Sequence, residues 1–337
     1  MRRVALSLSA LTAAGLLLSA CGGSASSSPE ASGSQSVQNG ADLTQYWPLT
    51  GLQVPADQSA ALDHPVLVTK MDNTTSSAPQ LGLSHADMVV EELVEGGLTR
   101  LAAFSYSDIA KDVGPVRSMR ASDIAIVSPV HASIVTSGAA PRTIALIKAA
   151  QIPFYGEGTP GFYRVNNRPS PYNLLAHLDE VAKVAKAKPA TPPDYFTWGS
   201  EADFPKGPKA THIGAQFSGG HTTQWFYTNG SYHNTNSNAP AGDQFPATTV
   251  LVLRVREGDA GYLDPAGNHV PKTLLVGQGK ALMFHDGHVV RATWHKGGKP
   301  TSQITLTTKQ GALKVPAGHT WVELVPISGG NVTWTKK

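Results

Sequence analysis

The chain contains very little cysteine and few charged residues. Its single cysteine, Cys21, cannot close a disulfide within the chain, so stability must come from apolar burial. Charged residues make up 15% of the 337 residues, below the roughly 25% usual in soluble proteins, while hydrophobic residues reach 41%, enough for a real core. Without Arg2 and Arg3, the 27 basic residues fall to 25 against 24 acidic ones. No basic run stands out, so we expect no nucleic-acid partner.

Sequence signatures of common catalytic and cofactor sites are also missing. There is no G-x-S-x-G motif around Ser118, so a pairing of Ser118 with His131 as nucleophile and base has little support. His285, His288 and His295 lie close together, but no H-E-x-x-H pattern accompanies them, and Asp-Gly between the first two indicates a hairpin turn. No phosphate-binding or dinucleotide-binding fingerprint is present. The sequence therefore predicts neither a cofactor nor a metal site.

The amino terminus has the organisation of an export signal. Arg2 and Arg3 precede the apolar run VALSLSALTAAGLLLSA (4–20), which is short for a membrane span. The sequence LSAC that ends at Cys21 resembles the lipobox of bacterial lipoproteins, in which the cysteine is acylated. We predict a lipoprotein signal peptide at 1–20 and an acyl anchor on Cys21 that holds the protein on the extracytoplasmic face of the cell membrane. An ordinary secretory peptide cleaved after Ala20 is the alternative.

The next segment is rich in small polar residues. Residues 21–45 contain almost no large apolar side chains, so burial cannot offset the entropy lost on ordering. We expect a flexible tether, and about 25 such residues span roughly 25–30 Å on average.

The remaining chain divides by pattern into two parts. Residues 46–190 alternate strand-like runs, such as HPVLVTKMDN (64–73), with helical patterns at 141–153 and 173–187, which predicts an N-terminal mixed α/β domain. Residues 191–208 are Pro-rich and predict a linker. Strand signals dominate 209–335, which predicts a mainly β C-terminal domain. The predicted fold class is therefore α+β.

Several motifs in this body resemble one family. PLTGLQV (48–54), MDN (71–73), GPVRSMR (114–120) and GHTWVELVP (318–326) are similar to segments of the YerB-type lipoproteins, the DUF3048 family. The resemblance implies a bacterial envelope lipoprotein with an N-terminal and a C-terminal part, and no established activity. The chain departs from the family pattern at TSGAAP (136–141), where a glycine-rich turn is usual.

The stretch EELVEGGLTR (91–100) predicts a β-hairpin. With a two-residue turn at 96–97, side-chain alternation places Glu91, Glu95 and Arg100 on one face of the hairpin. Glu92 then lies on the opposite, apolar face, where a carboxylate is unexpected. Two interpretations stay open: a surface ion-pair cluster, or a polar face that lines a cleft.

Two further arginines follow a Gly-Pro turn. If a helix begins near Ser118, Arg117 and Arg120 lie at its amino-terminal end, where cations are unfavourable unless an anion is also present. We expect one anion-binding cleft, with internal salt bridges as the alternative. Its predicted residues are Asp72, Glu91, Glu95, Arg100, Arg117 and Arg120.

The loop GFYRVNNRPSPYN (161–173) combines cations, amides and a tyrosine. This mixture suits recognition of a sugar or peptide, although turn-forming asparagines on a surface loop give the same pattern. The candidate ligand-binding residues here are Arg164, Asn167, Arg168 and Asn173.

These observations favour a lipid-anchored envelope protein that binds an anionic ligand, such as a peptidoglycan fragment, or scaffolds an envelope protein. An envelope hydrolase is the alternative, with Glu91 or Asp72 as general acid or base. A third possibility is a purely structural lipoprotein whose arginines are all satisfied by Glu91 and Glu95, with no open pocket.

Overall fold

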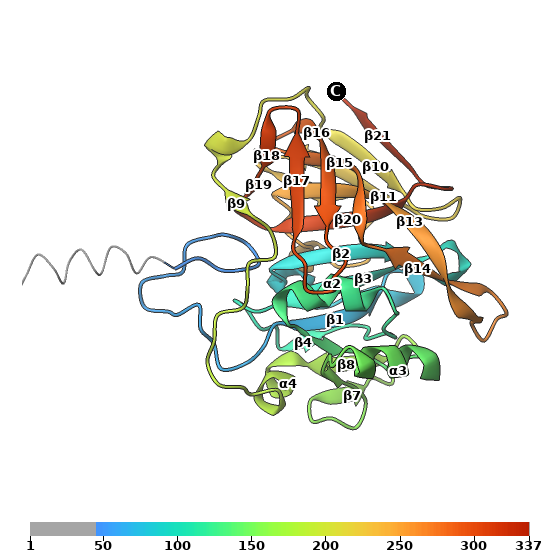
Figure 1. Ribbon diagram of the computed structural model, residues 1–337. Coiled ribbons are helices and arrows are strands. Elements are labelled where there is room, and N and C mark those ends of the chain that lie inside the picture. Colours follow the sequence, from blue (N-terminus) through green and yellow to red (C-terminus); the bar gives the residue numbers. More distant parts are fainter. Residues whose placement is uncertain (1–44, 337) are drawn as a thin grey trace, which may run out of the picture. The chain divides into compact units, whose positions relative to one another are not determined.

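The computed structural model describes residues 45–336, and these residues belong to one compact unit. The predicted signal peptide, Cys21 and the tether up to residue 44 lie outside the described residues. The body is mainly β, more so than the α+β prediction anticipated (Figure 1). Three short α-helices are present among the described residues: α2 (Asp123–Val127), α3 (Pro141–Ala149) and α4 (Leu178–Val184).

A twelve-stranded sheet passes through both halves of the body. Its order is β18-β17-β16-β15-β13-β20-β2-β3-β1-β5-β6, with β14 paired to β13. The N-terminal half contributes β1 (Leu67–Asp72), β2 (Met88–Leu93), β3 (Thr99–Ser105), β5 (Ser133–Val135) and β6 (Phe154–Tyr155). The C-terminal half contributes β13 (Thr249–Leu263), β14 (His269–Leu274), β15 (Gly277–His285), β16 (His288–Lys296), β17 (Ile304–Thr308), β18 (Gly311–Leu313) and β20 (Thr320–Pro326). Parallel pairing of β2 with β20 joins the two halves, with Glu91 opposite Glu323.

Smaller sheets complete the body. A four-stranded sheet has the order β12-β11-β10-β21, from β12 (Ser231–Asn234), β11 (Thr222–Thr228), β10 (His212–Gln216) and β21 (Asn331–Thr335). A three-stranded sheet contains β4 (Asp112–Val113), β8 (Leu174–His177) and β7 (Phe162–Arg164). The helix predicted at 173–187 is wrong at its start, because 174–177 form β8 and the helix begins at Leu178.

The Pro-rich segment 191–208 packs onto the body. Tyr195 and Phe196 are fully buried within it, and β9 (Trp198–Gly199) pairs in parallel with β19 (Val315–Pro316). Apolar burial and this short backbone pairing therefore hold the segment against the body.

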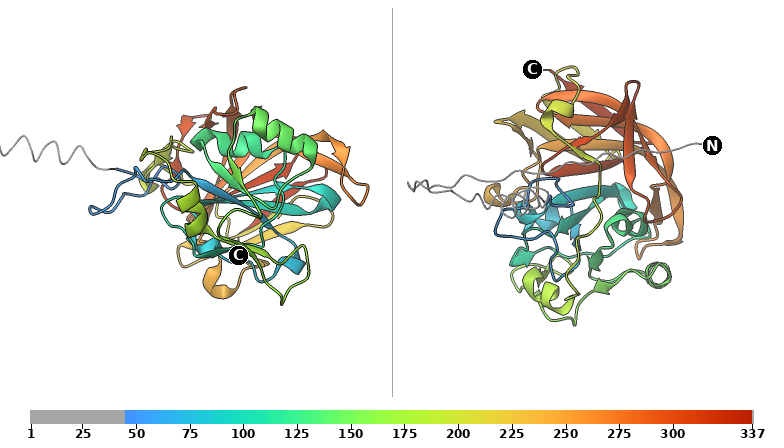
Figure 2. Two further views of the ribbon diagram at one scale, coloured as in Figure 1. Left: turned by 90° about the horizontal axis from the view of Figure 1, so that it is seen from below. Right: turned by 60° about the vertical axis from the view of Figure 1, so that its left-hand side comes forward.

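Side-chain alternation gives the large sheet two buried faces. One face carries Val68, Val90 and Ala102 and packs against helices that include Ile126 and Ile147. The other face carries Met71, Val89 and Leu101 and packs against the four-stranded sheet. Figure 2 (left) shows this layering, with the green helices on one side of the large sheet and the yellow strands of the smaller sheet on the other.

The β2–β3 hairpin has a different register from the predicted one. Residues 94–98 form the connection, in which Gly96 and Gly97 both have positive φ values and Val94 N–H donates to Leu98 O. Glu92 therefore lies opposite Arg100, and Glu91 opposite Leu101. A shift of one residue moves side chains to the opposite face. The prediction that Glu91 and Arg100 share a face is wrong for this reason.

Candidate functional site

Three of the predicted residues line a pocket of about 520 Å³. Glu95, Arg117 and Arg120 form one wall, and Pro141 at the start of α3 lies beside them. Residues 262–265 of the β13–β14 hairpin form the facing wall. Figure 1 shows this hairpin in orange, extending past the end of the large sheet. The pocket therefore needs segments from both halves of the chain.

The segment that carries Arg117 runs along β1 as irregular strand. Arg117 N–H donates to Lys70 O at 2.7 Å, and Asp72 N–H donates to Pro115 O at 3.1 Å. The helix that we expected near Ser118 begins only at Asp123, so Arg117 and Arg120 are not at a helix start. Instead, Arg120 N–H donates to Asp123 Oδ2 at 2.6 Å, which ties the arginine segment to the start of α2.

Two carboxylates face the arginines. Glu95 receives two hydrogen bonds from Arg120, one from Nε to Oε2 at 3.0 Å and a shorter one from Nη2 to Oε1. Asp72 Oδ2 lies 3.2 Å from Arg117 Nε. Burial alone would raise the pKa of Glu95, but Arg120 outweighs it and lowers that pKa, so Glu95 is ionised at neutral pH.

Among the described residues, several guanidinium nitrogens of the arginine cluster donate no hydrogen bond. Arg100 is 5% exposed, and its Nη1 donates to Ser118 O at 3.0 Å. Its Nε and Arg117 Nη1 are buried with no hydrogen-bond partner among residues 45–336, while Arg117 Nε makes the ion-pair contact with Asp72 but no hydrogen bond. Burial, and then the neighbouring Arg120 and Arg117, lower the pKa of Arg100 to about 10. Three guanidinium groups thus meet the carboxylates of Asp72 and Glu95, and part of their hydrogen-bonding capacity is unused.

The loop 161–173 contributes mainly to its own structure. Arg164 binds Glu157 at 2.6 Å and Asn173 Oδ1 at 2.7 Å, and all three groups lie outside the pocket. Arg168 Nη1 donates to Ser77 O at 3.4 Å, and Asn167 is exposed. These predicted ligand residues are therefore not brought together with the arginine cluster. Tyr172, from the same loop, places its ring 5.3 Å from Arg117 Cζ.

Glu91 lies on the opposite face of the sheet from the arginines. It is fully buried and accepts hydrogen bonds from Asn73 Nδ2 and Thr223 Oγ1, and His221 Nε2 lies 2.9 Å from its Oε1. Its neighbour Glu323 is also fully buried, and burial together with Glu91 raises the pKa of Glu323 well above its usual value. No sequence motif links positions 91, 221 and 323, so only the tertiary structure, which pairs β2 with β20 and brings His221 to Glu91, reveals this cluster.

Glu92, unexpected on an apolar face, has a partner there. Lys70 Nζ lies 2.9 Å from Glu92 Oε1 and 2.7 Å from Asp123 Oδ1, and all three side chains are at most 1% exposed. Asp123 also accepts the Arg120 N–H, so this buried triad supports the pocket wall from behind.

The part of the chain that the structure describes lacks both a metal-ligand cluster and a membrane-spanning helix. Between residues 45 and 336, no group of three or more His, Cys, Asp or Glu side chains is arranged to hold a metal ion. None of the helices in this range is long and apolar enough to cross a membrane.

Comparison with known proteins identifies the family. A model described as "Protein of unknown function (DUF3048) N-terminal domain" matches residues 49–191, and the corresponding C-terminal domain matches 213–322. The chain belongs to the DUF3048 family. Within it, the chain is 26% identical to "Putative lipoprotein YerB" of Bacillus subtilis (strain 168) over 298 residues, covering 83% of this chain and 86% of the relative.

The crystal structure of the YerB protein from Bacillus subtilis has a similar fold. The TM-score is 0.71 at 20% identity, with 86% of this chain and 99% of that chain covered. The resemblance to the DUF3048 family seen in the sequence is therefore confirmed, and its two family domains correspond to the two halves joined by β2 and β20.

Proposed function

We propose that this DUF3048 protein is a lipid-anchored envelope protein that binds an anionic ligand in the arginine-lined pocket. The observation that supports the proposal most strongly is the surplus of guanidinium donors in the cluster that lines the pocket. Arg117 Nη1 in the pocket wall, and Arg100 Nε behind that wall, are buried without a hydrogen-bond partner among the described residues, whereas Arg117 Nε forms an ion pair with Asp72. A buried donor left unpaired costs about 1–3 kcal/mol, and a carboxylate or phosphate would remove that cost.

The ligand class follows from charge and shape. Guanidinium groups bind planar carboxylates and phosphates through paired hydrogen bonds. The pocket volume of about 520 Å³ is in the range of small-molecule sites. A peptidoglycan fragment that carries a carboxylate fits these requirements and matches the proposed location at the cell envelope.

Binding is favoured over hydrolysis by the state of the acidic residues. Glu91 and Asp72, the candidate acid and base, are 0% and 2% exposed. Glu91 is engaged by Asn73 and Thr223, and Asp72 accepts hydrogen bonds from the Thr74 N–H and hydroxyl. A general acid or base must reach the substrate.

The anchor rests on the sequence and on the name of the relative, a lipoprotein. We expect a Cys21→Ser chain to leave the membrane fraction and appear in the soluble extracytoplasmic fraction. If the Cys21→Ser chain stays with the membrane, the acyl anchor is not what holds the protein there.

Ligand binding is tested by thermal shift on residues 45–337 with muropeptides and with glucose 1-phosphate. A ligand at one hundred times its dissociation constant stabilises the folded state by about 2.7 kcal/mol. We expect a salt-sensitive shift that is lost in Arg117→Gln and kept in Arg164→Gln, because Arg164 lies outside the pocket. Equal loss in both variants, or no shift with either probe, would contradict the proposal.

A further inference from the structure

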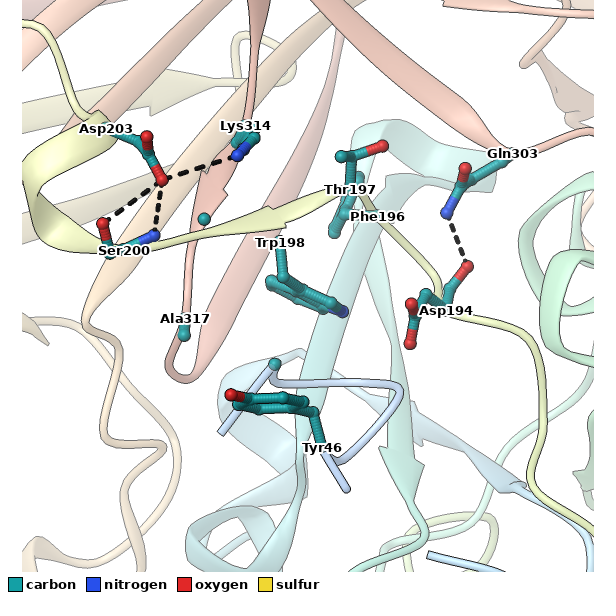
Figure 3. A pocket seen from close by; sticks show the side chains of 12 residues that line it. Tyr46, Asp194, Phe196, Thr197, Trp198, Ser200, Asp203, Gln303, Lys314 and Ala317 are labelled. Carbon is teal, nitrogen blue, oxygen red and sulfur yellow. Dashed lines mark hydrogen bonds and ion pairs between the residues drawn. The ribbon is translucent and has the colours of Figure 1, made fainter. Parts of the chain in front are cut away.

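A second pocket, of about 630 Å³, lies where the amino-terminal end of the body meets the segment that follows Asp194. Four separate parts of the chain line it: Tyr46 and Gly51, residues 194–203, Gln303, and the turn from Lys314 to Ala317. It shares no lining residue with the arginine-lined pocket. Figure 3 shows Trp198 at its centre, with Tyr46 on one side of the indole.

Trp198 is a rigid, partly exposed aromatic surface. Its Nε1 donates to Pro48 O at 3.1 Å, and Phe196 packs edge-on against it with ring centres 5.6 Å apart. Gly51 lies directly against the indole, since a Cβ built there would come within 2.5 Å of Trp198 Cγ. The indole orientation is therefore held from several directions. Tyr46, which is 55% exposed, adds a second aromatic surface to the pocket.

Polar groups flank the indole on two sides (Figure 3). On one side, Gln303 Nε2 donates to Asp194 O at 2.7 Å, which positions the amide next to the Asp194 carboxylate. Partial burial raises the pKa of Asp194. On the other side, Asp203 Oδ2 accepts the Ser200 N–H at 2.9 Å and lies 3.7 Å from Lys314 Nζ. Carboxylate and amide acceptors and one ammonium donor thus surround an apolar ring surface.

We propose that this pocket binds a saccharide, with one pyranose ring packed against Trp198 and its hydroxyl groups bonded to Asp194 and Gln303 on one side and to Asp203 and Lys314 on the other. A pyranose has an apolar C–H face and hydroxyl groups around its edge, which matches an aromatic surface bordered by acceptors. A wholly apolar ligand would desolvate the Asp194 carboxylate without offering it a hydrogen-bond donor. An anion would meet two carboxylates and one ammonium, so the charge does not favour it.

The proposal is tested by isothermal titration calorimetry on the mature-length chain carrying Cys21→Ser. The probes are chitotetraose, cellotetraose and maltotetraose, each to 10 mM, with tetramethylammonium as a cationic comparison. We expect at least one tetrasaccharide to bind saturably. Its affinity should fall at least tenfold in Trp198→Ala and in Asp194→Ala, the second variant being an exposed position that leaves the packing of the indole intact.

Two variants serve as controls. Trp334→Ala removes another partly exposed tryptophan, in β21, and should change the affinity less than threefold. Arg164→Gln should also leave saccharide binding unchanged, because Arg164 lines neither pocket. The proposal is overturned if no tetrasaccharide binds, if binding survives both Trp198→Ala and Asp194→Ala, or if only tetramethylammonium binds.

Discussion

Replacing Lys70 with methionine tests whether the buried triad stabilises the body. In the native protein, burial alone would lower the pKa of Lys70, but Asp123 and Glu92 outweigh it and raise that pKa, so the ammonium is charged at neutral pH. Methionine has a similar length and no charge. The substitution would leave Glu92 and Asp123, both at most 1% exposed, without their cation.

The expected cost is large because buried charges have no water to replace the lost partner. Removing one member of a buried ion pair typically destabilises a protein by about 3–5 kcal/mol. At about 2–4 °C per kcal/mol for a domain of this size, the melting temperature should fall by about 6–20 °C. The matched control is Lys183→Met, since Lys183 is 74% exposed and forms an ion pair with Asp179 on the surface of α4. That change should cost at most about 0.5 kcal/mol.

The pH dependence gives a second readout. Because Lys70 has a raised pKa, its stabilisation persists through neutral pH and is lost only as pH rises above 10.5. In Lys70→Met, protonation of Glu92, whose pKa burial already raises, relieves the uncompensated charge as pH falls. We therefore expect the deficit to be smaller at pH 4 than at pH 7.5, measured by differential scanning calorimetry. Equal melting temperatures for Lys70→Met and Lys183→Met at pH 7.5 would refute this reasoning.

Two further predictions concern contacts between the halves of the body. Burial alone would lower the pKa of His221, but Glu91 outweighs it and raises that pKa, while His221 helps to lower the pKa of Glu91. The stabilisation from this pair is therefore present between about pH 4.5 and 6.5 and is lost as pH falls below or rises above this window. In urea unfolding, His221→Gln should lose about 1.5–3 kcal/mol at pH 5.5 and less at pH 9, and an equal loss at both pH values would contradict the pairing. Asp243 accepts hydrogen bonds from the Gly82 and Ser84 N–H groups and the Ser84 hydroxyl. Asp243→Ala should cost about 1–3 kcal/mol in the same assay, whereas an unchanged urea midpoint would show that these bonds add nothing.

Local patterns in the sequence were sufficient to predict the individual strands and helices that bury apolar side chains. The run PVLVTKM predicted a buried strand, and Leu67–Asp72 form β1 with every residue buried. The helical spacing after Pro141 predicted a helix, and α3 covers Pro141–Ala149. The sequence also groups Arg117 and Arg120 with Glu95 and Asp72, but on the premise of a helix start near Ser118, and the structure begins that helix only at Asp123.

The register of the β2–β3 hairpin required the tertiary structure. The glycines at 96–97 were visible, but they do not determine whether the connection has two residues or five. Because strand side chains alternate between faces, a shift of one residue in the pairing places Glu91 on the face opposite to Arg100. Glu92 instead lies directly opposite Arg100 in the paired strand. The sequence identifies the charged residues of the hairpin, but it does not determine on which face of the sheet each side chain lies.

The sequence by itself thus determined the low charge content of the chain, the lack of an internal disulfide, its strand-forming runs and its membership of the DUF3048 family. Only the tertiary structure decided which distant residues meet. The wall of the arginine pocket at 262–265, the contact of His221 with Glu91, and the grouping of Tyr46, Trp198 and Gln303 all depend on strand order and chain crossing. Local propensity acts over a few residues, whereas these contacts join positions that are more than one hundred residues apart.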